Sequence, residues 1–181
     1  MAFKEKKMTN RKNWLVMMLI SGFIFTGCIA NLFQDELKEK PKKEAETNWN
    51  GHRYVLYVEN KYGKSWTDAR DFCKEKGGHL VTITSLEEQE ALYELAQEKG
   101  AKNLYWIGAS SQSGTDFEWV TGEPWGYTNW RSGEPNNPVG GSENYVQMYR
   151  DDGKWNDGEN NGDVMEYWSL QNTGFICEWD N

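Results

Sequence analysis

Aromatic residues restrict how this chain can fold more than any other feature. They make up 14% of its 181 residues, including ten tryptophans and nine tyrosines, and they concentrate from Asn48 onward. Rings of this size bury enough apolar area to offset the entropy lost on folding, which argues against intrinsic disorder. The length suits one domain preceded by a tail. We therefore expect a single aromatic-rich domain over residues 48–181.

The charge and the metal-binding residue types exclude further classes. The formal net charge is −8, and binding to a phosphate backbone needs a basic surface, so nucleic acid is not an expected partner. Two histidines and three cysteines leave little material for a zinc site built from histidine and cysteine.

The first 27 residues have the layout of an export signal. A basic segment precedes an apolar run over residues 14–25, and small residues then precede Cys28. This arrangement resembles the lipobox of bacterial lipoproteins, with Phe25 where leucine is usual, and predicts a signal peptide over 1–27 with lipidation of Cys28. The product would be an exported, membrane-anchored lipoprotein on the cell envelope or surface. Two alternatives stay open: an uncleaved single-pass anchor with an extracytoplasmic C-terminus, because the apolar stretch extends to Phe33, and simple secretion.

Residues 28–47 are predicted to form a charged linker. Its second part, QDELKEKPKKEAET over residues 34–47, has mixed charge and no aromatic residue, which is typical of a solvated spacer. The alternative is an amphipathic helix on the domain, since many of these residues favour helix.

Two helices and a set of short strands are predicted after the linker. The helices, over residues 65–76 and 85–99, each begin with a capping box, Ser65 with Asp68 and Ser85 with Glu88. The apolar spacing of the second helix predicts that Leu86, Ala91, Leu92 and Leu95 face inward. The strand candidates are residues 53–58, 79–83, 104–109, 117–120, 144–150 and 174–179. Helices early and strands late indicate an α+β domain.

More than twenty residues between Val120 and Asn144 have little periodicity, and a loop of that length is usually functional. This loop and the DGKWND run after it carry many side-chain oxygens and no histidine or thiolate. Such ligands suit a hard cation, and six to eight of them at about 2.3–2.6 Å are typical of calcium. A cis Glu134–Pro135 bond would turn the two flanking side chains inward. The oxygen-bearing residues are Glu134, Asn136, Asn137, Glu143, Asn144, Asn156 and Asp157.

From about Asn48 to its end, the chain resembles a C-type lectin domain of the type whose calcium site carries EPN and WND motifs. The resemblance covers roughly three-quarters of the chain. The motifs that carry it occur in order: WTDARDFC (66–73), GGHL (77–80), WIG (106–108), WVTGEP (119–124), NW (129–130), EPN (134–136), WND (155–157) and FICE (175–178). It implies a C-type lectin-like α+β fold, with two helices flanking short antiparallel sheets and a long calcium-binding loop.

The resemblance also implies a binding site. In the family, the matching positions hold one calcium ion, and the same side chains bind two vicinal sugar hydroxyls that coordinate the ion. Carboxylates accept hydroxyl protons while asparagine amides donate to hydroxyl oxygens. The EPN order is associated with mannose, fucose, glucose or N-acetylglucosamine. The expected calcium and carbohydrate ligands are Glu134, Asn136, Glu143, Asn156 and Asp157.

The chain departs from the family pattern at three points. Cys73 and Cys177 match the outer disulfide, whereas Tyr145 lies where the inner disulfide would have its first cysteine. The four residues directly after Gly108, Ala109 to Gln112, include no acidic ligand. The auxiliary calcium site of some family members is therefore not expected, and one calcium ion is expected. Residues 158–169 exceed the usual connection after WND.

Three functions compete. We expect a surface lectin that binds glycans or glycoproteins. The alternative is a protein-binding adhesin or receptor in which calcium only orders the loop. An enzyme is not expected, because the best-placed acids are assigned to the metal and no nucleophile with a base is apparent.

Overall fold

The computed structural model describes residues 40–59, 63–137, 141–161 and 172–180. All of them belong to one unit, Glu39–Asn181. The predicted signal peptide and Cys28 lie outside the described residues, as does most of the 158–169 segment. Within these ranges, no helix is long and apolar enough to cross a bilayer.

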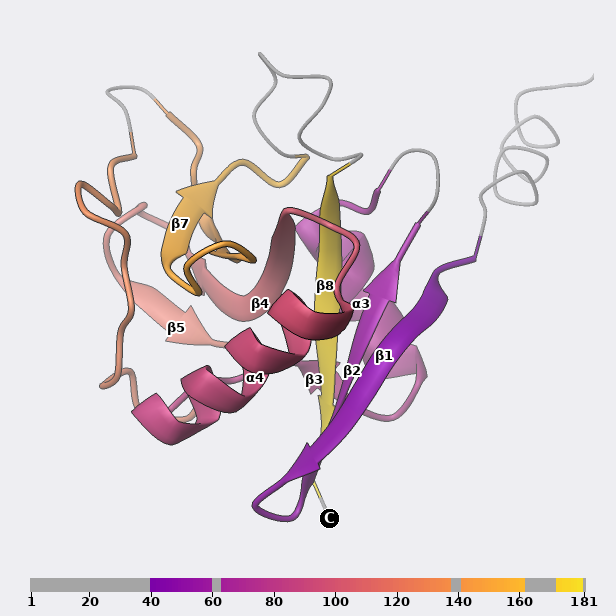
Figure 1. Ribbon diagram of the computed structural model, residues 1–181. Helices are drawn as coiled ribbons and strands as arrows, with labels where there is room; N and C mark the ends of the chain where they lie inside the picture. The colour runs from indigo at the N-terminus through magenta and orange to yellow at the C-terminus, as the bar shows by residue number, and fades with distance from the viewer. Residues whose placement is uncertain (1–39, 60–62, 138–140, 162–171, 181) are drawn as a thin grey trace, which may run out of the picture. The chain divides into compact units, whose positions relative to one another are not determined.

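Among the described residues, eight strands form one sheet with the order β1-β2-β8-β4-β6-β7, while β3 pairs with β8 and β5 with β4 (Figure 1). Strands β4 and β8 run parallel, and the other pairs run antiparallel. The sheet is therefore mixed rather than purely antiparallel. The long chain segment between β4 and β8 provides the crossover that a parallel pair needs. The strands are β1 (Lys42–Trp49), β2 (His52–Val58), β3 (His79–Leu80), β4 (Leu104–Ser111), β5 (Phe117–Trp119), β6 (Tyr145–Tyr149), β7 (Trp155–Gly158) and β8 (Thr173–Trp179).

Strand β1 corrects the predicted domain boundary. Residues 42–47, assigned to the linker from sequence, belong to this strand and pair with β2. Trp49 and His52 face each other across a two-residue turn in which Asn50 and Gly51 both have positive φ, 48° and 89°. Asn-Gly favours this kind of tight hairpin, and its twist matches that of the strands. The linker therefore ends earlier than residue 47.

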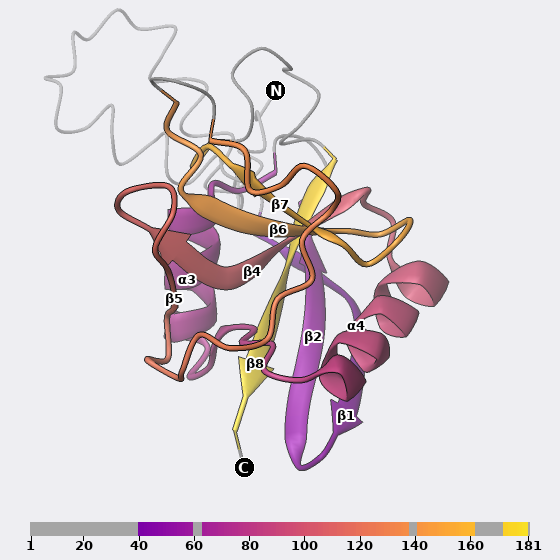
Figure 2. The same cartoon turned by 90° about the vertical axis from the view of Figure 1, so that its left-hand side faces the viewer.

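The two helices lie on opposite sides of β2 and β8, as Figures 1 and 2 show together. Helix α3 spans Trp66–Glu75 and α4 spans Leu86–Lys99. Both predicted caps are confirmed, because Ser65 accepts the Asp68 amide and Ser85 accepts the Glu88 amide. Side chains of alternate residues on a strand point to opposite faces, so each face of the sheet packs against its own helix.

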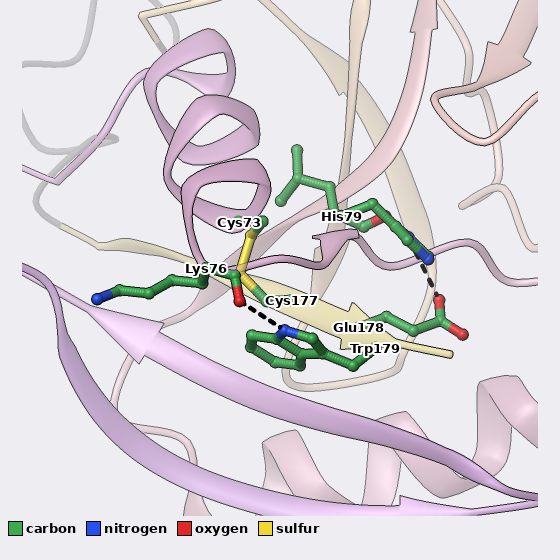
Figure 3. Close-up of a disulfide and its surroundings, with 7 residues drawn as sticks. Cys73, Lys76, His79, Cys177, Glu178 and Trp179 are labelled. Carbon is green, nitrogen blue, oxygen red and sulfur yellow. Dashed lines mark hydrogen bonds and ion pairs between the residues drawn. A yellow bond between two sulfur atoms is a disulfide. The ribbon is translucent and has the colours of Figure 1, made fainter. Parts of the chain in front are cut away.

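Two apolar clusters form the core. On the α4 side, Leu92 and Ala96 pack with Leu56 and Ile176, which pair across β2 and β8. On the α3 side, the predicted Cys73–Cys177 disulfide is confirmed and joins α3 to β8 (Figure 3). The disulfide therefore ties the first helix to the last strand.

One prediction about a buried position is wrong. Leu86, predicted to face inward, is 53% exposed, whereas Glu88 and Gln89 beside it are buried. Tyr145, at the position of the missing cysteine, packs against Trp66 with ring centroids 4.8 Å apart. An aromatic contact thus occupies the place of the second disulfide.

Candidate functional site

The long loop lies against strand β7. The Trp155 amide donates to the Asn129 carbonyl at 2.9 Å, and the Arg131 amide donates to the Trp155 carbonyl at 2.9 Å. The Trp155 ring is fully buried among other aromatic rings, which explains why this contact is well defined. The EPN segment begins three residues after Arg131 and is therefore placed beside Asn156 and Asp157.

Asp157 is the centre of the site. Its side chain is fully buried, and its two carboxylate oxygens accept the backbone N–H groups of Asn136 at 3.1 Å and Asn137 at 3.0 Å. Hydrogen bonds to an ionised carboxylate are stronger than neutral ones. Asp157 thus orients the backbone of the EPN segment in addition to providing oxygen atoms.

Glu134 lies beside this aspartate. Burial, followed by the nearby Asp157 carboxylate, raises the pKa of Glu134 above its ordinary value. Its Oε2 is buried and has no hydrogen-bond partner among the described residues. The Glu134–Pro135 peptide bond is cis, as the sequence suggested. A buried carboxylate oxygen next to a second carboxylate is an arrangement that a bound cation would stabilise.

Asn156 and Glu143 are connected to the same centre. The Asn156 side-chain amide donates to the Asp157 backbone carbonyl, so the Asn156 side chain lies beside the Asp157 carbonyl oxygen. The Glu143 amide donates to the side-chain oxygen of Asn137 at 3.3 Å, and the Asn137 backbone in turn binds Asp157. The other four predicted ligands therefore contact Asp157 directly or through Asn137.

The chemistry of these groups fits calcium. They provide carboxylate, amide and backbone carbonyl oxygens, and the five contain no nitrogen or sulfur ligand of the kind that transition metals prefer. Their carboxylates are nevertheless dispersed: within the described part of the chain, Glu134, Glu143 and Asp157 do not form a cluster whose ligand atoms all lie within 4.8 Å of one another. A bound ion would draw these side chains together.

Sequence reasoning missed the contact that supports Asn137. This residue has a positive φ of 22°, and its side-chain amide lies against Gly114 so closely that a Cβ there would collide with it. Its Nδ2 also points to the Ser113 carbonyl at 3.5 Å. The glycine in the 110–115 segment was the available signal, but its role depends on a neighbour 23 residues away.

Two aromatic residues of the long loop, Trp125 and Tyr127, pack against the core. Trp125 stacks on Phe117 and contacts Trp119 and Trp155, with centroids 4.9–6.1 Å apart. Tyr127 meets Trp155 edge to face at 5.8 Å. Both rings are only partly buried and pack against the larger cluster.

Comparison with known proteins places these observations in a family. The family model described as "Lectin C-type domain" matches residues 62–178. A lectin from Pleurodeles waltl is 33% identical over 151 residues, which are 79% of this chain and 82% of that protein. Asialoglycoprotein receptor 1 from Pongo abelii is 35% identical over 61% of this chain. The chain spans only 38% of that receptor.

A solved structure agrees. The cow carbohydrate-recognition domain of CD23, crystallised in the presence of a GlcNAc2Man3 oligosaccharide, is 32% identical. It superposes with a TM-score of 0.61 and covers 76% of this chain and 95% of that one. The predicted fold is thereby confirmed. Proteins of the matched family are non-enzymatic carbohydrate-binding proteins, which confirms that the chain is not an enzyme.

Proposed function

Because the chain belongs to the C-type lectin domain family, we propose that it binds carbohydrate in a calcium-dependent manner. The observation that carries this proposal is the pair of hydrogen bonds from the Asn136 and Asn137 backbone to Asp157, which brings the oxygen-bearing residues of the loop beside those of β7. Membership of the family alone supports carbohydrate binding; the oxygen-only character of this cluster supports calcium as the ion.

The ion and the sugar would use the same residues. Glu134, Asn136, Glu143, Asn156 and Asp157 would hold one calcium ion. When bound, calcium supplies coordination positions for two neighbouring hydroxyl groups of a sugar. The carboxylates of the chain accept hydrogen bonds from those hydroxyls and the amides of Asn136 and Asn156 donate to them, so each hydroxyl serves as both donor and acceptor.

The EPN order supports a narrower proposal on the ligand. We infer that sugars of the mannose, fucose, glucose and N-acetylglucosamine type bind here. The GlcNAc2Man3 oligosaccharide present with the crystallised CD23 domain consists of two of these sugars. Single sites of this kind bind weakly, so several copies on one surface would be needed for strong retention of a glycoprotein.

Export to the cell surface would provide such an array. We propose that residues 1–27 direct export and that Cys28 is lipidated, on the basis of the basic segment, the apolar run and the small residues before Cys28. Mass spectrometry of the mature N-terminus tests this directly. A diacylated or triacylated Cys28 is expected, whereas an intact Met1 would show an uncleaved anchor.

A glycan array with calcium, repeated with a chelator, tests the carbohydrate proposal. We expect retention of mannose-type glycans with calcium and its loss with chelator or in Glu134→Gln. The matched control is Glu123→Gln, which removes one charge from an exposed position in the same loop and should bind like the wild type. Calcium binding without retention of any glycan would contradict the lectin function and favour the protein-binding alternative.

A further inference from the structure

Both histidines of the chain lie close to the same two carboxylates. His52 Nδ1 is 2.7 Å from Glu178 Oε1 and 2.9 Å from Asp180 Oδ1. His79 Nε2 is 3.3 Å from Asp180 Oδ2. The ligand atoms of His52, Glu178 and Asp180 all lie within 4.8 Å of one another. In the described part of the chain, His52, Glu178 and Asp180 therefore form a compact group. His79 lies at its edge, with Nε2 facing Asp180 and Nδ1 3.8 Å from Glu178 Oε2.

The strand register explains this convergence. Tyr54 of β2 pairs with Glu178 of β8, so the residues two positions further along the antiparallel pair, His52 and Asp180, lie on the same face. His79 of β3 pairs with Glu178 from the other side. Figure 3 shows His79 and Glu178 pointing toward each other, next to the disulfide. Strands therefore place His52, His79 and Glu178, and Asp180 follows the last residue of β8 directly.

Backbone groups orient two of the four side chains. The Leu80 carbonyl lies 2.9 Å from His79 Nδ1. Because a carbonyl only accepts, Nδ1 carries the proton, and Nε2 is the nitrogen that faces Asp180. Glu178 Oε2 accepts the Thr82 amide at 3.0 Å, which leaves Oε1 directed to His52. Metal-binding sites use outer contacts of this kind to fix the ring and the carboxylate of their ligands.

We propose that His52, His79, Glu178 and Asp180 bind a divalent transition-metal ion, and that zinc is the ion. Two imidazole nitrogens and two carboxylate oxygens are a ligand set that zinc accepts in tetrahedral geometry, whereas calcium prefers oxygen ligands. Zinc ligands at about 2.0–2.2 Å from the ion lie roughly 3.3 Å apart. His52 Nδ1 lies 2.7 and 2.9 Å from the Glu178 and Asp180 carboxylates, and His79 Nε2 lies 3.3 Å from Asp180. Carboxylates take the place of cysteine ligands, since Cys73 and Cys177 are paired in the disulfide.

Burial suits a site that exchanges its ion with solvent. The Glu178 side chain is 3% exposed, while those of His79, His52 and Asp180 are 21%, 38% and 63% exposed. The ion would reach the buried carboxylate through the exposed side. Since the aspartate is largely in solvent, it can shift by the half ångström or so that coordination requires without disturbing the packing of the core.

Calorimetric titration of zinc into the full chain tests the proposal. The protein is purified in detergent without a histidine tag and stripped with chelator. We expect one zinc ion per chain with micromolar or tighter affinity, and at least tenfold weaker binding in Asp180→Asn and in His79→Gln. Asp68→Asn, which removes an exposed carboxylate from the first turn of α3, is the matched control and should bind like the wild type.

A second measurement separates this site from the loop. Cobalt bound in place of zinc should give the visible absorption of a tetrahedral ion, and Glu134→Gln should leave that spectrum unchanged. Wild-type affinity in Asp180→Asn with intact folding by circular dichroism would overturn the proposal, as would the absence of zinc binding at about 100 μM. Loss of zinc binding only in Glu134→Gln would assign the ion to the loop instead.

Discussion

Substitution of Asp157 by asparagine tests whether this residue orders the loop as well as binding an ion. The side chain is fully buried and accepts two backbone amides, from Asn136 at 3.1 Å and Asn137 at 3.0 Å. Each hydrogen bond to a charged acceptor contributes about 1.5–3 kcal/mol. Asparagine keeps a single neutral acceptor oxygen, so one bond is lost and the other weakens. We expect a loss of about 2–4 kcal/mol in the local stability of the EPN segment.

Hydrogen exchange measures this loss at the two amides themselves. A decrease of about 2–4 kcal/mol corresponds to exchange that is roughly 30 to 1,000 times faster in metal-free protein. The matched control is Glu134→Gln, which removes the neighbouring carboxylate but leaves both hydrogen bonds in place. That variant should lose calcium affinity while the amides of Asn136 and Asn137 keep their wild-type exchange rates.

Two outcomes would refute the reasoning. Unchanged exchange in Asp157→Asn would mean that the two hydrogen bonds do not order the segment. Equal acceleration in Glu134→Gln would mean that the loss of charge, and not the loss of these bonds, loosens the loop. Calorimetry with calcium on the same samples should show weaker binding in both variants, because each lacks one of the predicted carboxylate ligands.

Three further predictions follow from other contacts. Burial and the neighbouring aspartate raise the pKa of Glu134. In metal-free protein, the stabilising contribution of Glu134 is therefore complete below its unfolded pKa and is lost as pH rises through its folded pKa. Over that pH range calcium affinity should rise and the melting temperature should fall relative to Glu134→Gln, and identical pH profiles of the two proteins would contradict this. Replacing Cys73 and Cys177 with serine opens a 104-residue loop and should cost up to about 4.7 kcal/mol in denaturant unfolding, whereas an unchanged midpoint would show that the bridge is dispensable. Trp155→Phe leaves the buried Gln89 oxygen without its 2.7 Å donor and should lower stability by about 1–3 kcal/mol; a calorimetric melting temperature equal to that of the wild type would argue against the bond.

The apolar pattern of the sequence did not predict which polar residues are buried. Apolar periodicity predicted Leu86 as inward-facing, but the structure buries Glu88 and Gln89 instead. Glu88 accepts the Tyr54 hydroxyl at 2.7 Å, and Gln89 accepts the Trp155 indole at 2.7 Å. These polar side chains are tolerated inside because partners from distant strands satisfy them, and no local pattern contains those partners.

The sequence alone determined the local structure and the types of ligand. Helix starts followed from Ser65 and Ser85, since capping depends on residues only three positions apart. Ordered motifs predicted the fold and the Cys73–Cys177 pairing. The residue types of the loop predicted an oxygen site for a hard cation, because ligand preference is a property of the side chains themselves.

Tertiary structure decided which distant groups meet. It placed the backbone N–H groups of Asn136 and Asn137 within hydrogen-bond distance of the Asp157 carboxylate. It also joined β1 to the sheet through a hairpin, although the charged composition of these residues had predicted a linker. It also brought His52 and Asp180 together from opposite ends of the domain. Such contacts depend on strand register, which is set by the packing of the whole sheet and not by any short stretch of sequence.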